Sequence, residues 1–171
     1  MERGENKQEV TIMDMMQCRE RRVQIQNELI QEFHTPVVSF CMNIPGPVKT
    51  DQLIRLGFES GKEALLKALA ESSVQIFKIV EFHEITGDEL LLSADAPAEK
   101  LKDMAVNIEE THKFGRLFDM DIIGTDGEKL SRQIYRKCLI CGDQAQNCAR
   151  SRKHTIAEMQ EQIRKILSCK E

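Results

Sequence analysis

Apolar residues recur at spacings of three and four in several stretches of the chain, a period that predicts amphipathic helices. We expect these helices at about 11–33, at about 51–71, from Pro97 onward and at about 155–168. The first and the last begin at capping signals, because Thr11 precedes Asp14 by three residues and Thr155 precedes Glu158 by three.

Other stretches alternate between apolar and polar residues, which is the period of a β-strand. Between residues 37 and 44, for example, Val38, Phe40 and Met42 fall on one face and Ser39 and Cys41 on the other. The same reasoning predicts strands at 37–44, 74–85, 89–94, 116–123 and 128–134. Thr86-Gly87-Asp88 joins the second strand to the third, and Asp126-Gly127 is a hairpin signal before the last.

The order strand–helix–strand–strand–helix–strand over 37–123 is that of the split βαβ, or ferredoxin-like, arrangement. It predicts the α+β class, with an antiparallel sheet and helices packed on one face. We expect one domain over 1–171, with a core at about 37–135 that includes an added β-hairpin. A Cys/His knuckle at about 138–154 and the flanking N- and C-terminal helices complete it.

Composition narrows the classes of function. The 171 residues carry a formal charge of −4 and no Trp, which argues against binding of bulk nucleic acid, since that needs a basic surface. The chain begins without an apolar signal segment and has no apolar run of about 18 residues, so we expect a cytoplasmic protein without a membrane span. In that reducing compartment the six cysteines are expected to be thiols or metal ligands.

Asp119 and Asp121 are the first candidates for chemistry. On a strand they share one face, at about 6–7 Å between Cα atoms, while Phe118, Met120 and Ile122 share the other. Two carboxylates so close repel each other unless a cation compensates them, and Mg²⁺ favours this kind of ligand together with substrate phosphates. The alternative is a solvated strand face whose aspartates pair with Arg116 or Arg132.

A second candidate is the loop that follows the first predicted strand. In it Pro45 stiffens the turn, Gly46 allows close backbone approach, and Lys49 supplies a positive charge before the N-terminus of a helix, which favours anions. An ordinary rigid turn with an exposed lysine explains the same residues. His112 is a candidate general base or, alternatively, a hydrogen-bonding residue at a helix end. The arginines at 19, 21 and 22 could bind phosphates or form a solvated helix face.

A third candidate lies near the C-terminus, where Cys138, Cys141, Cys148 and His154 have the ligand types of a tetrahedral Zn²⁺ site. A full set of four protein ligands would make the site structural rather than catalytic. The alternative is three reduced cysteines and a capping histidine.

Taken together, these motifs resemble one family over nearly the whole chain, the CitX family of apo-citrate-lyase phosphoribosyl-dephospho-CoA transferases. The likeness rests on the runs Pro36-Val37-Val38-Ser39-Phe40, Ile44-Pro45-Gly46-Pro47-Val48-Lys49, Gly115-Arg116-Leu117-Phe118-Asp119-Met120-Asp121, Leu130-Ser131-Arg132, Cys138-Leu139-Ile140-Cys141, Cys148-Ala149-Arg150, and His154. The chain departs from the family pattern at Lys113-Phe114, where the family has Pro-Leu after the histidine.

The resemblance implies a defined reaction. A serine hydroxyl on the citrate lyase acyl carrier protein (the gamma subunit) attacks the α-phosphorus of triphosphoribosyl-dephospho-CoA, and pyrophosphate leaves. It further implies Mg²⁺ on Asp119 and Asp121, and the triphosphate on Lys49, Arg116 and Arg132, beside the Pro45–Gly46 turn. His112 becomes the candidate base for the carrier serine.

Other functions are compatible with the residues alone. One is a carrier-protein synthase that uses another CoA-derived donor. Another is a non-catalytic zinc-knuckle module that binds a protein partner. A basic group formed by Arg150, Arg152 and Lys153 could meet the acidic surface of a carrier protein in either case.

Overall fold

The computed structural model describes residues 8–169, which fold around a four-stranded antiparallel sheet. Along the chain the elements are α1 (Ile12–Phe33), β1 (Val37–Met42), α2 (Gln52–Glu71), β2 (Ile76–Glu84), β3 (Gly87–Ala94), α3 (Ala98–Thr111), the short 3₁₀ helix η1 (Gly115–Leu117), β4 (Phe118–Ile123), α4 (Ala145–Ser151) and α5 (Ile156–Ser168). The predicted α+β class is confirmed.

The strands lie in the order β2-β3-β1-β4, and every neighbouring pair is antiparallel. β1 is central: Phe40 stands opposite Leu90 of β3 on one side and opposite Met120 of β4 on the other. β4 is therefore an edge strand, and one side of its backbone faces away from the sheet.

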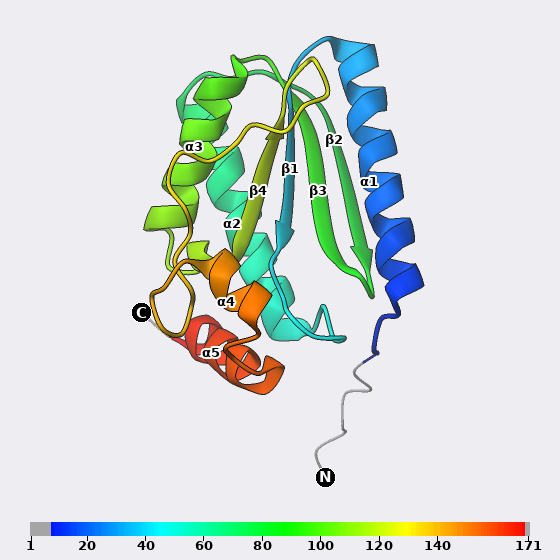
Figure 1. Cartoon of the computed structure of the whole chain (residues 1–171). Helices are drawn as coiled ribbons and strands as arrows, with labels where there is room; N and C mark the ends of the chain where they lie inside the picture. The colour runs from blue at the N-terminus through cyan, green and yellow to red at the C-terminus, as the bar shows by residue number, and fades with distance from the viewer. Residues whose placement is uncertain (1–7, 170–171) are drawn as a thin grey trace.

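Helices cover both faces of the sheet (Figure 1): α2 and α3 lie on one face and α1 on the other. The alternation of the strands builds a separate apolar cluster on each face. Val38 and Phe40 join α2, α3 and α5 in the larger cluster, while Val37 joins Leu29 of α1 in a smaller one. The two helices of the predicted core, α2 and α3, therefore lie on one face as expected, and the flanking helix α1 covers the other face, where Val37, Leu91 and Ile123 need a cover.

The helix starts expected from the sequence are confirmed. Thr11 and Asp14 form a reciprocal capping box at α1, and Thr155 and Glu158 form another at α5. The side chain of Asp51 accepts a hydrogen bond from the Ile54 N–H at the start of α2. These caps satisfy backbone donors that the first turn of a helix leaves without a partner.

The predicted fifth strand at 128–134 is wrong. After the hairpin turn, Lys129 makes a single bridge to Ile123, and the N–H of Leu130 donates to the carbonyl of Ile122. Beyond that point side chains take over the free edge of β4: Glu109 of α3 accepts from the Met120 N–H, and Arg136 donates to the Phe118 carbonyl. These side chains occupy two of the backbone groups that a fifth strand would need.

Several strand boundaries also differ from the prediction: β2 is shorter at both ends than 74–85, and β3 begins at Gly87 rather than at residue 89. β1 ends at Met42 rather than at residue 44, and β4 begins at Phe118 because η1 occupies 115–117. The short helix α4 inside the Cys/His segment was not expected.

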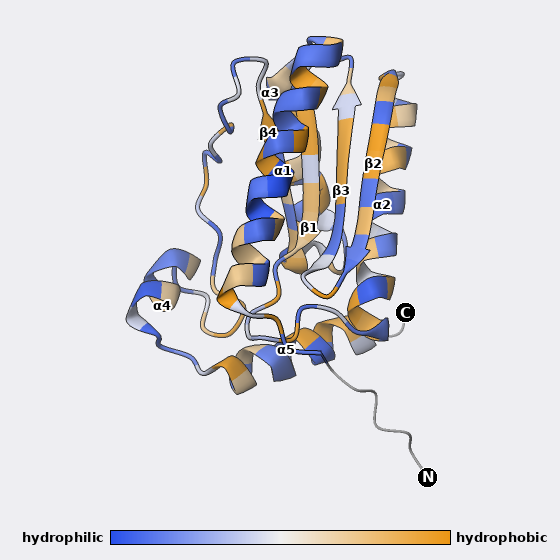
Figure 2. Cartoon of the chain, turned by 90° about the vertical axis from the view of Figure 1, so that its right-hand side faces the viewer, coloured by the Kyte–Doolittle hydropathy of each residue, from blue (hydrophilic) through white to orange (hydrophobic). Residues whose placement is uncertain are grey.

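Among the residues that the structure describes, no helix is both long enough and apolar enough to cross a lipid bilayer. In Figure 2, the view onto α1, hydrophilic residues alternate with apolar ones along this helix, as its position on the surface requires.

Gly61 of α2 provides a test of the larger core. A Cβ there would lie 2.6 Å from Cζ of Phe40 and 2.8 Å from Cζ of Phe118, and these two rings are already packed edge to face. We expect Gly61→Ala to lower the free energy of unfolding by about 1–3 kcal/mol, because overpacking outweighs the gain in helix propensity. Urea denaturation measures it, with Glu63→Ala on the exposed side of α2 as the control; equal or greater stability of Gly61→Ala contradicts the packing described.

Candidate active site

The two aspartates lie side by side on the face of β4 that is turned toward α1. Phe118, Met120 and Ile122 are buried in the core on the other face, so the alternation of the strand places Asp119 and Asp121 together. Both are partly exposed. The predicted arrangement of the pair is thus what the structure has.

A row of polar side chains continues from Asp119 across the sheet. Asp119 stands opposite Cys41 of β1, and Cys41 stands opposite Glu89 of β3. Residues opposite each other on neighbouring strands share a face, with Cβ atoms about 5 Å apart. The three side chains therefore lie beneath the N-terminal half of α1, whereas the small apolar cluster around Leu29 lies beneath its C-terminal half.

Arg22 of α1 is fixed above this row by an ion pair. Its Nε donates to Oε2 of Glu89 at 2.8 Å, and its Nη2 donates to Oε1 at 2.9 Å. The thiol of Cys18 lies 2.5 Å from the same Oε1. Burial alone would raise the pKa of Glu89, but the hydrogen bonds from Arg22 and Cys18 outweigh burial and hold the pKa below its ordinary value. Glu89 is thus a buried, charged acceptor.

The charge of the aspartates is compensated only in part. Lys129 contacts Asp121, with Nζ 2.7 Å from Oδ2. Burial raises the pKa of Asp119, and the neighbouring Asp121 raises it further, despite the opposing charges of Lys129 and two arginines. A raised pKa means that the surroundings disfavour the charged carboxylate. A divalent cation on the two carboxylates would remove that penalty, so the donor set fits Mg²⁺.

Cys41 sits between the acidic groups as a neutral thiol. Burial, followed by the charge of Asp119, raises its pKa to about 12. It therefore adds no negative charge to the row at neutral pH.

Lys49 lies at the same end of the sheet, beyond β1. Its Nζ donates to the Ile44 carbonyl at 2.7 Å, and burial followed by the nearby charge of Arg19 lowers its pKa. Gly46 packs beneath α5 instead: a Cβ there, where φ is +88°, would meet Gln160 and Ile156 at 2.8 Å. Contact with this helix accounts for the glycine.

The structure does not bring Arg116 and Arg132 to the aspartates. Arg116 donates to the Lys137 carbonyl, and Arg132 pairs with Glu109 and Glu110 of α3 at 3.5 and 3.1 Å. The alternative in which these arginines neutralise the aspartates is wrong, because Lys129 is the contacting cation.

His112 ends α3 on the other face of the sheet. Its Nε2 lies 3.1 Å from the Ser60 hydroxyl, its Nδ1 accepts from the Phe114 N–H, and its ring packs 4.9 Å from that of Phe118. Burial, with Lys113 adding to it, lowers the pKa of His112. Because Phe118 points away from the face of Asp119, the structure separates His112 from the aspartates.

Sequence reasoning missed Glu109, which supports β4 from the edge. Its side chain is buried, accepts from the Met120 N–H at 2.8 Å and pairs with Arg136 at 2.9 Å. Burial raises the pKa of Glu109 although both neighbouring arginines oppose it. The sequence held one indication that Glu109 is buried. It lies four residues after the buried Ala105 of α3, so this acidic residue falls on the apolar stripe of the helix.

The predicted zinc ligands come together. Cys138, Cys141, Cys148 and His154 each offer one ligand atom, and these four atoms lie within 4.8 Å of one another. Nε2 of His154 is buried without a hydrogen-bond partner, which a metal would supply. The donor set fits tetrahedral Zn²⁺.

This knuckle is attached to the start of β4. The side chain of Arg136 donates to the Phe118 carbonyl, while its own carbonyl accepts from the Ala145 N–H at the start of α4. The Cys/His segment is thereby linked through one residue to the strand that carries Asp119.

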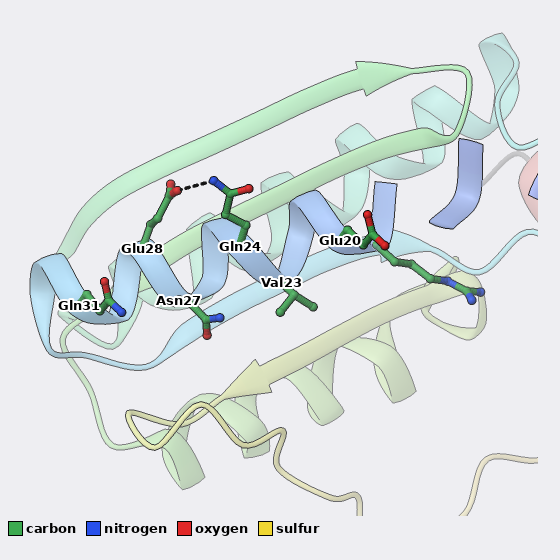
Figure 3. A pocket seen from close by; sticks show the side chains of 7 residues that line it. Glu20, Val23, Gln24, Asn27, Glu28 and Gln31 are labelled. Atoms are coloured by element: carbon green, nitrogen blue, oxygen red, sulfur yellow. Dashed lines mark hydrogen bonds between the residues drawn. The ribbon is translucent and has the colours of Figure 1, made fainter. Parts of the chain in front are cut away.

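A shallow hollow runs along α1 (Figure 3), lined by Arg19, Glu20, Val23, Gln24, Asn27, Glu28 and Gln31. Val23 and Asn27 point to the side of the helix on which β4 lies, whereas Gln24 and Glu28, which are hydrogen-bonded to each other, point to the opposite side. α1 packs on β1 and β3, so it does not bury the aspartates of β4 completely.

A pair of carboxylates among fixed cations is the arrangement that an enzyme acting on phosphate groups needs. Comparison with known proteins gives the particular family. The model of the apo-citrate lyase phosphoribosyl-dephospho-CoA transferase family (CitX) matches residues 10–170, and the chain belongs to this family.

Relatives of the same name are found in Shigella boydii serotype 18, Escherichia coli O157:H7 and Shigella sonnei. Each is 32% identical to this chain over 163 residues, which cover 93% of this chain and 89% of the relative.

Glu109 gives a test of how the edge of β4 is held. Glu109→Ala removes the carboxylate that pairs with Arg136 and the acceptor of the Met120 N–H, so we expect a loss of about 3 kcal/mol in the free energy of unfolding. Glu110→Ala, which removes an exposed partner of Arg132, should cost less than about 1 kcal/mol. Urea denaturation of both variants checks this, and equal losses would contradict it.

Proposed function

We propose that this chain transfers the phosphoribosyl-dephospho-CoA group to apo-citrate lyase, and that the transfer takes place on the α1 face of β4. Membership of the family supports the reaction. The observation that carries the location is the placement of Asp119 and Asp121 on one partly exposed face among cations.

In the reaction proposed, the donor is triphosphoribosyl-dephospho-CoA and the acceptor is a serine of the citrate lyase acyl carrier protein. The serine oxygen forms a bond to the α-phosphorus while the bond from that phosphorus to the bridging oxygen of the β-phosphate breaks. Pyrophosphate leaves with the electron pair, and the serine proton passes to water. The product is a phosphodiester on the carrier.

Asp119 and Asp121 would hold a Mg²⁺ ion, which when bound supplies charge neutralisation to the phosphates. The protein's own task is to present both carboxylates from one rigid strand. Lys129, in contact with Asp121, restrains that carboxylate and limits repulsion within the pair. Lys49 is retained as a phosphate ligand because its loop lies at the start of α1, where the Val10 N–H donates to the Pro47 carbonyl.

The other predicted site residues have a weaker claim. Arg116, Arg132 and His112 have partners elsewhere, so we assign them no contact with the donor. Gly46 shapes the loop that carries Lys49 through its contact with α5, and Pro45 precedes it in that loop.

The knuckle is proposed as a structural zinc site. All four ligands come from the protein, so no coordination position is open for catalysis. Its role would be to fix the segment after Arg136 against the start of β4. The exposed arginines of this segment, Arg150 and Arg152, are proposed contacts for the acidic carrier protein.

The sheet order and the antiparallel pairing support a finer description of the core, as a ferredoxin-like βαββαβ unit. The cytoplasmic location stays a prediction from the sequence.

The carboxylates are tested by Asp119→Asn and Asp121→Asn. Each change keeps the size of the side chain but removes a negative charge from the metal site, so we expect a loss of about 10²-fold or more in transfer rate. The assay is mass spectrometry of the carrier protein after incubation with triphosphoribosyl-dephospho-CoA and Mg²⁺, with pyrophosphate measured in parallel. An attached group without the phosphoribosyl unit would indicate another CoA-derived donor.

Asp103→Asn, on the exposed side of α3, serves as the control and should retain full activity. Thermal melts of all three variants should match the unmodified protein. Near-normal transfer by both strand variants would remove the basis for the site.

Zinc is tested by metal analysis of the purified protein, which should contain about one zinc ion per chain if the four ligands act together. Cys141→Ser should abolish most of this zinc and lower the melting temperature, because the site contributes to folding. Cys169→Ser changes a cysteine outside the cluster and should affect neither quantity. Protein that is stable and free of zinc when expressed with zinc in the medium would rule out the structural site.

A further inference from the structure

Arg22 has a geometry that neither the fold nor the aspartate pair explains. It is held side-on, with Nε and Nη2 both directed to the buried carboxylate of Glu89. A guanidinium has five N–H donors, so this mode leaves the two donors of Nη1 free of Glu89. The partner Glu89 is almost fully buried, at 3% exposure.

A buried ion pair of this kind is poor evidence for added stability, since the desolvation of both charges offsets their attraction. What it does provide is a fixed orientation for a charged group. A carboxylate that holds an arginine on one side has already restricted the side chain. The remaining N–H donors can then bind an anion on the other side without a further loss of conformational entropy.

The ion pair with Glu89 places Arg22 over the row of side chains that leads to the aspartates. Glu89, Cys41 and Asp119 occupy neighbouring positions of one row across β3, β1 and β4. Neighbouring strands lie about 5 Å apart, so Asp119 is about 10 Å from Glu89, a distance that a ligand with several phosphates can span.

Two further cations lie at this end of α1. Arg19 is three residues before Arg22 and shares its side of the helix. The loop that carries Lys49 lies at the same end of α1, because the Val10 N–H, just before this helix, donates to the Pro47 carbonyl at 2.8 Å. The charge of Arg19 adds to burial in lowering the pKa of Lys49. Within residues 8–169, no acidic side chain forms an ion pair with Arg19 or Lys49. Like charges gathered without a counter-ion favour an anionic ligand.

We propose that Arg22, Arg19 and Lys49 form an anion subsite for the pyrophosphate portion of the donor, and that Glu89 is the positioning residue that orients Arg22 within it. This rests on the proposed function for the identity of the ligand. Asp119 and Asp121 would hold a metal against the α-phosphate that is transferred, and the subsite would hold the two phosphates that leave.

The roles of the three cations differ. Arg22 gives directed hydrogen bonds because Glu89 fixes its plane. Arg19 is exposed, so its side chain can adjust its conformation to the ligand. Lys49 donates to the carbonyl of Ile44, which restrains it, and supplies a point charge. Together they would keep the leaving pyrophosphate neutralised as the bond to the α-phosphorus breaks.

The probe is inorganic pyrophosphate in the presence of Mg²⁺, with its affinity for the full-length chain measured by isothermal titration calorimetry. We expect Arg22→Lys to weaken binding by about tenfold or more, because lysine cannot reproduce the oriented donors of arginine. Arg19→Ala and Lys49→Ala should each weaken it several-fold.

Arg21→Lys is the matched control. Arg21 is the next residue of the same helix and also forms an ion pair, but with Glu84, and its guanidinium lies over the ring of Phe82, 4.1 Å from the centroid. It should leave pyrophosphate affinity unchanged. Equal effects of Arg21→Lys and Arg22→Lys, or no effect of Arg22→Lys, would overturn the subsite.

The role of Glu89 is tested by a double-mutant cycle with Glu89→Gln, which keeps the shape of the side chain but loses its charge. If Glu89 acts through Arg22, the double variant should bind pyrophosphate no more weakly than Arg22→Lys alone. Additive losses would assign Glu89 a separate role and contradict positioning. Should Glu89→Gln fail to fold, the comparison of Arg22→Lys with Arg21→Lys still decides whether the subsite exists.

The same variants separate this inference from the proposed function. Transfer to apo carrier protein together with unchanged pyrophosphate binding by Arg22→Lys overturns the subsite alone. Pyrophosphate binding that depends on Arg22, without any transfer to the carrier, leaves the subsite in place and overturns the reaction.

Discussion

The constraint on which the site depends is the two-sided packing of β4. One face of this strand supplies Phe118, Met120 and Ile122 to the main core. Because side chains alternate along a strand, the same burial forces Asp119 and Asp121 together onto the opposite face. A shift of register by one residue would bury both carboxylates, at a cost that the core could not offset.

The two halves of α1 cover this face of the sheet in different ways. Its C-terminal half packs Leu29 on Val37 and Leu91, which anchors the helix on the sheet. Its N-terminal half lies over polar residues and contributes Arg22, which pairs with Glu89. The apolar part therefore fixes the position of the polar part. Arg22 is held at a defined place because the apolar contacts of Leu29 fix the position of the whole helix.

Much of this architecture follows from the sequence. Alternation around Asp119 and Asp121 is a local property, so their common face was predictable, and so was the approach of the four Cys/His residues within a short segment. The absence of the fifth strand could not be predicted, because it depends on a side chain of α3, Glu109, which occupies the edge of β4. Arg22 and Glu89 are 67 positions apart in the sequence, and no local pattern around either residue predicts that they pair.

The most direct test of the account is the position of a divalent ion. Crystals grown with Mn²⁺ and pyrophosphate should give an anomalous scattering peak within coordination distance of carboxylate oxygens of both Asp119 and Asp121, with pyrophosphate on the side of Arg22. Absence of a peak there, with Asp121 still paired to Lys129 and the anion bound at another surface, would contradict the central claim that these carboxylates jointly hold a metal against the donor's phosphates.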